Sequence, residues 1–86
     1  MPWQLIVAPR AEKDLADLPL RDRQAMGRAL DSLTRDPAAV DLRKLEGRPG
    51  HWRLRVGRWR AVLRLDNAAG AVYVLRVLAR DRAYPD

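Results

Sequence analysis

Several residue types are scarce in this 86-residue chain, and each scarcity excludes a class of protein. There is no cysteine, so the chain has neither a disulfide framework nor a thiolate metal site. His51 is the only histidine, which argues against a zinc site. No apolar run approaches the roughly 20 residues that a membrane-spanning helix needs. The segment 1–14 lacks the basic start and the small-residue cleavage site of a signal peptide. We therefore expect a soluble cytoplasmic protein without a cofactor and without a membrane partner.

The length and composition indicate one small domain over residues 1–86. Hydrophobic residues make up 48% of the chain, which excludes a disordered tail. A chain of this size buries only about 60–65% of its unfolded surface, enough for a single sheet covered by a helix pair. We find no internal repeat, linker or low-complexity segment that would divide it.

The net charge of +6 is concentrated in one short block. Residues 1–42 have a net charge of −1, residues 43–60 have +6, and residues 61–86 have +1. Such a block attracts polyanions by Coulomb attraction and counterion release. The alternative is a solvated face of an arginine-rich protein.

The N-terminal half reads as a strand followed by two helices. Trp3–Ala8 is a short apolar run with β-branched residues, which predicts a strand that Pro9 ends. Ala11, Leu15 and Leu18 then recur at helical spacing, with charged residues between them, up to Pro19. A second helix is predicted over Leu20–Thr34, with Met26, Leu30 and Leu33 on one face. Asp36 and Pro37 end that helix and start a short turn.

The C-terminal half reads as a loop and three strands. We predict a loop over 38–50, strands at His51–Val56 and Trp59–Asp66 joined by a tight turn at Gly57-Arg58, and a strand at Ala71–Leu78. The last strand is apolar on both faces, which is typical of a central strand covered on both sides. The order βααβββ predicts an α+β fold: a mostly antiparallel sheet with an N-terminal helical hairpin packed on one face.

Arginines alternate with apolar residues along the predicted hairpin. Because side chains alternate between the faces of a strand, Trp52, Leu54 and Val56 point to the core, and Arg53 and Arg55 to the open face. Arg60, across the turn, can reach the same side. Guanidinium groups held side by side repel one another unless an anion lies between them, so three on one sheet predict a phosphate site. The alternative is an edge hairpin that uses charge to prevent aggregation.

One expectation follows from placing these arginines on an exposed face. Arg60→Ala is expected to leave the fold intact, since an exposed arginine contributes little stability.

The segment after the last strand adds Arg80, Arg82 and Tyr84. A tyrosine beside arginines can stack on a nucleobase while the arginines hold the backbone. Alternatively, Tyr84 packs on the edge of the domain.

An ordered set of short motifs covers nearly the full chain. These are A-x-K-D-L-x-x-L-P at 11–19, L-x-x-D-P at 33–37, K-L-x-G at 44–47, aromatic-R-L-R-V-G-x-aromatic-R at 52–60, and R-V-x-x-R-x-x-x-Y at 76–84. In this set the chain resembles the RelE/ParE toxin superfamily of bacterial and archaeal toxin–antitoxin pairs, and within it the RelE-like mRNA endonucleases. The fold that this resemblance implies is the one predicted from periodicity.

The resemblance implies ribosome-dependent cleavage of mRNA in the A site by attack of a 2′-hydroxyl on the adjacent phosphate. Position by position, it implies that Arg60 and Arg80 bind the phosphate and that Arg53 and Arg55 contact the backbone and stabilise transition-state charge. Tyr84 orients the attacked nucleotide. Further RNA contacts are expected from four cations around this set: Lys44, Arg48, Arg58 and Arg82.

Two positions depart from the RelE pattern. Strand positions that are often lysine in RelE are Arg53 and Arg55 here, and arginine is a poor general base because it keeps its proton. Ala79 stands where many relatives have a histidine. His51, near Arg53 on the same predicted face, is the alternative base, although a lone histidine at the edge of a loop is more often incidental.

Three functions are compatible with these residues. The first is the ribosome-dependent endoribonuclease, whose partners are the ribosome and mRNA. The second is a ParE-like toxin that inhibits DNA gyrase by binding. The third is a non-catalytic relative that binds only an antitoxin or nucleic acid. For either toxin the resemblance implies a cognate antitoxin and a toxin–antitoxin hetero-oligomer.

Overall fold

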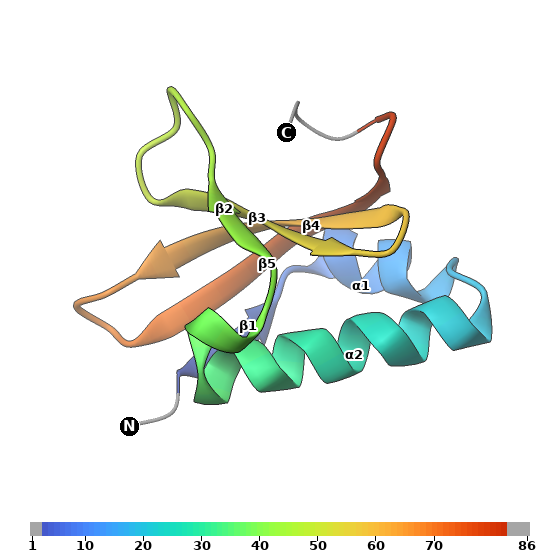
Figure 1. The fold of residues 1–86 in the computed structure, drawn as a ribbon, viewed down its shortest axis with the longest axis horizontal. Helices are drawn as coiled ribbons and strands as arrows, with labels where there is room; N and C mark the ends of the chain where they lie inside the picture. The colour runs from blue at the N-terminus through green and yellow to red at the C-terminus, as the bar shows by residue number, and fades with distance from the viewer. Residues whose placement is uncertain (1–2, 83–86) are drawn as a thin grey trace.

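The architecture is a twisted sheet with both helices on one of its faces (Figure 1). The computed structural model describes residues 3–82. Its elements in chain order are β1 (Gln4–Val7), α1 (Pro9–Ala16), α2 (Leu20–Arg35), a 3₁₀ turn η1 (Pro37–Ala39), β2 (Leu42–Lys44), β3 (His51–Val56), β4 (Trp59–Asp66) and β5 (Ala71–Ala79). The predicted α+β fold, with its helical hairpin on one face, is confirmed.

The two helices form where the apolar spacing and the prolines place them. Pro9 occupies the start of α1, a position that suits proline because its missing N–H would have no partner there. Pro19 precedes α2, whose buried residues are Met26, Leu30 and Leu33, at the spacing of one helix face. Asp36 accepts a hydrogen bond from the Ala38 N–H at 3.1 Å and so starts the η1 turn.

The sheet has the strand order β1-β5-β4-β3-β2. β1 pairs parallel with β5, and the other three pairs are antiparallel. The predicted turn at Gly57-Arg58 joins β3 to β4, and Gly57 has a φ of +58°, which favours glycine at the first central position of a tight hairpin. A register shift between Val62 and Leu63 leaves Leu75 of β5 without a partner in β4, which marks a bulge.

The predicted loop over 38–50 is wrong in one part, because residues 42–44 form the edge strand β2. Leu42 pairs with Leu54, and Arg43 with Arg53. A three-residue strand is too short to show a period of two in the sequence, and it exists here because β3 offers it a pairing edge.

The core lies between the helices and one face of the sheet. Its sheet residues are Leu54, Ala61, Leu63, Val72, Val74 and Val77, and its helix residues are Ala11, Leu18, Met26, Leu30 and Leu33. The expectation that the last strand is covered on both sides is only half right. Tyr73, Leu75 and Leu78 are half-buried, because the helices cover only one face.

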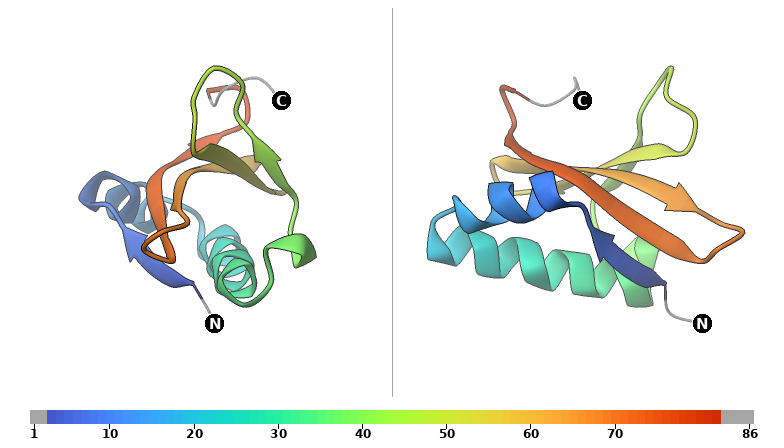
Figure 2. Two further views of the ribbon diagram at one scale, coloured as in Figure 1. Left: turned by 90° about the vertical axis from the view of Figure 1, so that its left-hand side faces the viewer. Right: turned by 180° about the vertical axis from the view of Figure 1, so that it is seen from behind.

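Two segments flank the opposite face of the sheet. The β2–β3 loop rises above this face at one end, and the chain following β5 rises above it at the other, as the turned views also show (Figure 2). The helix-free face therefore lies between two projecting segments and is not a flat, open surface.

Candidate functional site

The helix-free face of the sheet carries a group of basic residues that the strand register places together. Arg55 and Arg60 are direct cross-strand partners, Arg43 pairs with Arg53, and His51 pairs with Arg64. Directly opposite residues in an antiparallel pair project to the same face. We call this surface the cationic face: His51 and Arg43, Arg53, Arg55, Arg60 and Arg64. The predicted placement of Arg53, Arg55 and Arg60 on one side of the hairpin agrees with this register.

Burial on the cationic face differs from the expectation. Arg53 and Arg60 are only 2% and 3% exposed, so their side chains are not open to solvent. The Arg60 Nη1 donates hydrogen bonds to the Gly57 carbonyl at 2.9 Å and to the Trp59 carbonyl at 3.0 Å, which folds the guanidinium back onto the hairpin turn. Alternation indicates which face a side chain occupies, but not whether water reaches it there. The premise that Arg60→Ala removes an exposed side chain is therefore wrong.

Arg55 is exposed, but it has an anionic neighbour within the protein. Its Nε lies 2.6 Å from Asp41 Oδ2, and its backbone N–H donates to the Asp41 carbonyl at 2.9 Å. Asp41 immediately precedes β2, so the unpredicted edge strand brings this carboxylate to the hairpin. The ion pair relieves part of the repulsion between guanidinium groups that the sequence predicted.

The other predicted basic residues occupy two separate ends of β3. Lys44 and Arg48 are exposed on β2 and the β2–β3 loop, close in the chain to His51. The His51 Nδ1 lies 3.0 Å from the Pro49 carbonyl. At a strand rise of about 3.3 Å per residue, His51 is about 13 Å from Arg55. His51 and Arg53 share a face, as predicted, but His51 is remote from Arg60.

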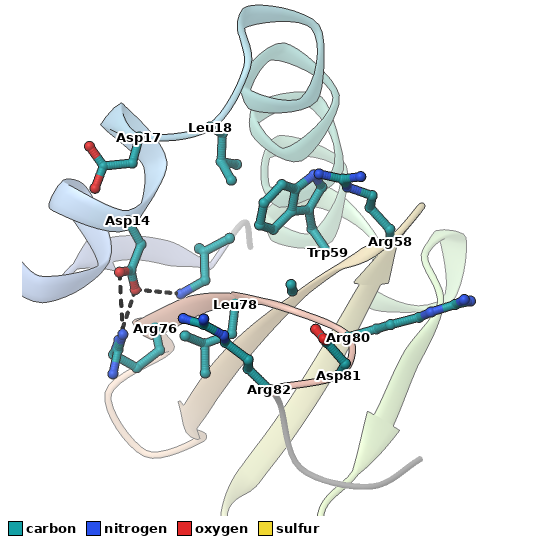
Figure 3. Close-up of a pocket in the computed structure, with 12 residues that line it drawn as sticks. Asp14, Asp17, Leu18, Arg58, Trp59, Arg76, Leu78, Arg80, Asp81 and Arg82 are labelled. Atoms are coloured by element: carbon teal, nitrogen blue, oxygen red, sulfur yellow. Dashed lines mark hydrogen bonds and ion pairs between the residues drawn. The ribbon is translucent and has the colours of Figure 1, made fainter.

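A pocket lies at the other end, between the α1–α2 corner, the hairpin turn and the end of β5 (Figure 3). Its volume is about 720 Å³. Arg58, Arg80 and Arg82 line it, together with Asp17, Asp81 and Trp59. The Arg58 guanidinium lies 5.1 Å from the centroid of the Trp59 ring, a cation–π contact. In the view of Figure 3, Arg82 is directed toward Leu78, and Arg80 extends in the opposite direction.

Arg80 is tied to the hairpin that carries Arg60. The Arg80 N–H donates to the Arg58 carbonyl at 2.8 Å, so the chain after β5 continues beside the β3–β4 turn. Leu78 is also the β5 partner of Arg60. The structure thus brings together the hairpin arginines and Arg80, whereas Lys44, Arg48 and His51 lie at the far end. Tyr84 lies outside the described residues.

Sequence reasoning missed one ion pair that holds the end of β5. Asp14 of α1 accepts hydrogen bonds from Arg76 Nε at 2.8 Å and from the Val77 N–H at 2.9 Å (Figure 3). β1 ends at Val7, which pairs with Val74 of β5. Beyond this point β1 no longer pairs with β5, and the Asp14 carboxylate accepts the Val77 N–H instead. Position 14 lies three residues after Ala11 and four before Leu18, so it is on the apolar face of α1. A carboxylate on the face that packs against the sheet was the available signal of a buried partner.

The environment of Asp14 changes its acidity. Burial alone would raise the pKa of this carboxyl, but the hydrogen bonds from Arg76 and from the Val77 N–H outweigh it and lower the pKa below its ordinary value. The same contact raises the pKa of Arg76. The pair is therefore fully ionised at neutral pH, and it fixes β5 to α1 just before Arg80.

Within residues 3–82, no group of three acidic, histidine or cysteine side chains is arranged to hold a metal ion. Neither described helix is long and apolar enough to cross a membrane.

Comparison with known proteins identifies the family. Residues 5–84 match the family described as "ParE toxin of type II toxin-antitoxin system, parDE". A solved structure of the RelBE2 toxin–antitoxin complex from Mycobacterium tuberculosis contains a chain that is 30% identical, with a TM-score of 0.80 and 93% of each chain covered. No curated protein sequence matches the chain significantly.

Two more distant structures share the fold. In the archaeal RelE–RelB complex from Pyrococcus horikoshii, the match is 24% identical, with a TM-score of 0.81 over 96% of this chain and 100% of that one. The isolated RelE toxin of Escherichia coli matches at 22% identity, with a TM-score of 0.78 over 94% of this chain and 87% of that one. The fold is thus that of RelE toxins. The chain belongs to the RelE/ParE superfamily and is a toxin of the type II toxin–antitoxin class.

Proposed function

We propose that this toxin is a ribosome-dependent endoribonuclease that cleaves mRNA in the A site. The observation that carries the proposal is the cross-strand pairing of Arg55 with Arg60, beside Arg53 and with Arg80 bonded to the same hairpin. Planar guanidinium groups match the oxygens of a phosphate in a two-pronged geometry, and a rigid sheet can hold several of them around one phosphate. The 30% identity to a chain of a RelBE complex supports the same assignment.

In this mechanism the 2′-hydroxyl loses its proton, the 2′-oxygen bonds to phosphorus, and the bond from phosphorus to the 5′-oxygen breaks. The leaving 5′-oxygen takes up a proton, so the products are a 2′,3′-cyclic phosphate and a 5′-hydroxyl. Arg60 and Arg80 bind the phosphate, and Arg53 and Arg55 contact the backbone and stabilise the added negative charge. Tyr84 orients the attacked nucleotide by stacking, and Arg58 and Arg82 add RNA contacts beside Arg80.

Positioning and charge stabilisation supply most of the catalysis in this proposal. Arginine keeps its proton, so none of the arginines acts as the general base. His51 is the one imidazole in the chain, and it is about 13 Å from the Arg55–Arg60 pair at the strand rise. A base at the scissile phosphate must lie within hydrogen-bond reach of the 2′-hydroxyl, which His51 does not. The ribosome holds the mRNA for in-line attack, and cleavage of free RNA is negligible.

The burial of Arg53 and Arg60 adds a requirement to this mechanism. A phosphate reaches the Arg60 guanidinium only after the surface above it opens, since 3% of the residue is exposed in the structure. Opening also releases the bonds from Arg60 to the Gly57 and Trp59 carbonyls and makes those N–H groups available to phosphate oxygens. RNA binding and rearrangement of the cationic face are thus coupled, and the described conformation is the resting state.

The partner proposed for the toxin is a cognate antitoxin, which gives a toxin–antitoxin hetero-oligomer in the cytoplasm. The similar chains from Mycobacterium tuberculosis and Pyrococcus horikoshii were solved in RelBE and RelE–RelB complexes. The net charge of +6 favours an acidic or amphipathic antitoxin segment that covers the arginines or displaces the C-terminal tail. A toxin that expresses well alone, arrests no growth and binds no partner would contradict this assignment.

The test of the proposed function is induction of the toxin without its antitoxin, followed by mapping of new RNA 5′ ends. The proposal predicts new 5′-hydroxyl ends within translated messages. The matched variant is Arg80→Ala, which removes an exposed side chain and leaves the fold intact. The proposal fails if growth stops without new ends, or if Arg80→Ala produces the same ends at the same rate as the wild-type toxin.

A second candidate is inhibition of DNA gyrase by binding, as in ParE-like toxins. The observation that favours it is the family match, whose description names the ParE toxin. The two candidates differ in their target, so a DNA supercoiling assay with purified gyrase separates them. Loss of supercoiling at stoichiometric toxin, with intact mRNA on ribosomes, would establish the second candidate instead of the first.

A further inference from the structure

Three residues that the proposed mechanism leaves unused form a row at the far end of the cationic face. Arg64 of β4 pairs with His51 of β3 on one side and with Tyr73 of β5 on the other. All three are half-buried. We call them the far row. It lies four residues along the hairpin from the Arg55–Arg60 pair, a distance of about 13 Å at the rise of an antiparallel strand.

Arg64 lies over an aromatic ring. Its guanidinium carbon is 4.3 Å from the centroid of Tyr73, its cross-strand partner, which is a cation–π contact. Within residues 3–82 no carboxylate forms an ion pair with Arg64, in contrast to Arg55 and Arg76. A guanidinium that contacts a ring through one face can still offer its N–H edge to a phosphate and its other face to a base.

His51 is fixed at the other end of the far row. The Pro49 carbonyl can only accept a hydrogen bond, so the 3.0 Å contact makes the His51 Nδ1 the donor. In the neutral ring, Nε2 is then the acceptor, and the ring orientation is set by the loop. A fixed imidazole offers a stacking surface and one acceptor, both of which suit an unpaired nucleobase.

We infer that the far row is a second RNA-binding subsite, which holds nucleotides away from the scissile phosphate. Arg64 takes a phosphate or a base on its free side, and His51 stacks on a neighbouring base. This inference rests on the proposed function, because the RNA enters at the Arg55–Arg60 pair and continues along the same face of the sheet. The adjacent Lys44 and Arg48 add positive charge at that end. The RNA is either the message itself or ribosomal RNA, which offer the same groups.

The test measures binding of the purified full-length toxin to a fluorescent single-stranded RNA and its cross-linking on programmed ribosomes. Arg64→Ala is expected to weaken RNA binding about tenfold. It is also expected to reduce the slope of log K against the logarithm of the salt concentration by about one. Arg64→Lys keeps the charge and loses the stack, so binding weakens while the salt dependence stays. The matched control is Arg28→Ala, which removes an exposed arginine from α2, on the other side of the molecule.

Cross-linking identifies the RNA strand and keeps the inference testable if a variant is unstable. Ribosomes carrying 4-thiouridine, in the mRNA or in the ribosomal RNA, are irradiated with bound toxin, and cross-linked peptides are identified by mass spectrometry. Cross-links to peptides containing His51 or Tyr73 are expected, and the labelled strand shows which RNA is bound.

The outcomes separate this inference from the proposed function. If wild-type toxin cleaves mRNA on ribosomes but Arg64→Ala binds RNA as Arg28→Ala does, and no cross-link maps to the far row, the inference is overturned and the proposed function stands. If Arg64→Ala instead weakens only antitoxin binding, the far row is an antitoxin surface and the inference is equally overturned. If wild-type toxin neither binds RNA nor cleaves it, both fail.

Discussion

Asp14→Asn tests whether the ion pair between α1 and β5 holds the end of the sheet that carries Arg80. The Asp14 side chain is 15% exposed and accepts hydrogen bonds from Arg76 and from the Val77 N–H. Hydrogen bonds to a charged group contribute about 1.5–3 kcal/mol each. Both of these donors bond to Oδ2, so an asparagine oxygen can still accept from both, but the two bonds lose their charge assistance. The asparagine NH₂ then faces Arg76 Nη2, which donates to Oδ1 at 3.4 Å in the wild type. We therefore expect the free energy of unfolding to fall by about 2 kcal/mol.

Chemical denaturation of the purified toxin measures this change directly, and thermal unfolding is expected to shift by about 8–16 °C for a domain of this size. The matched control is Asp17→Asn, an exposed aspartate three residues further along the chain, which is expected to change stability by less than about 0.5 kcal/mol. Equal stabilities of the Asp14→Asn and Asp17→Asn variants would refute the reasoning.

The pH dependence gives an independent check on Asp14. Because the pKa of this carboxyl is lowered in the folded protein, its contribution is fully present above the unfolded pKa of about 4 and is lost as pH falls through the folded pKa. The wild type therefore loses stability below about pH 4 more steeply than Asp14→Asn does. Parallel pH profiles would show that Asp14 carries no such contribution.

Three further predictions concern the cationic face and the chain after β5. Arg60→Ala is expected to abolish growth arrest. It is also expected to lower the free energy of unfolding by about 1–3 kcal/mol, because Arg60 is buried and bonded to the Gly57 and Trp59 carbonyls. An unchanged denaturation curve would contradict the expected loss of stability. His51→Ala is expected to leave the rate of the chemical step unchanged on saturated ribosomes; a hundredfold loss, with a missing limb of the pH–rate profile between about pH 6 and 7, would make His51 the base. Tyr84→Ala should lose more activity than Tyr84→Phe in ribosomal cleavage assays if the ring stacks on the nucleotide, and equal losses would argue for the hydroxyl.

The helices and the long strands were predictable because their signals are local. Met26, Leu30 and Leu33 lie at helical spacing between two prolines, and the alternation of Trp52 to Val56 shows the faces of β3. β2 was not predictable, since three residues show no period and the strand depends on pairing with β3. The same limit applied to Arg55, whose partner Asp41 reaches it only through that pairing.

The candidate site was predictable in its placement but not in its exposure. Alternation and register put Arg53 and Arg60 on the helix-free face, yet no local pattern shows that both are almost fully buried there. The pair Asp14–Arg76 joins residues 62 positions apart, so only the tertiary packing of α1 on β5 brings them together. The roles given to the arginines and to Tyr84 stay predictions until variants are measured.

The most direct measurement is cleavage of a defined message on purified ribosomes by purified toxin. With a codon placed in the A site, the account predicts one cut within that codon, a 2′,3′-cyclic phosphate on the upstream fragment and a 5′-hydroxyl on the downstream one. The same RNA without ribosomes stays intact, and Arg80→Ala slows the cut at least a hundredfold, because one preorganised charge-stabilising group contributes about 10²–10³ in rate. Intact A-site mRNA in the presence of active, folded toxin, together with inhibition of gyrase supercoiling, would contradict the account.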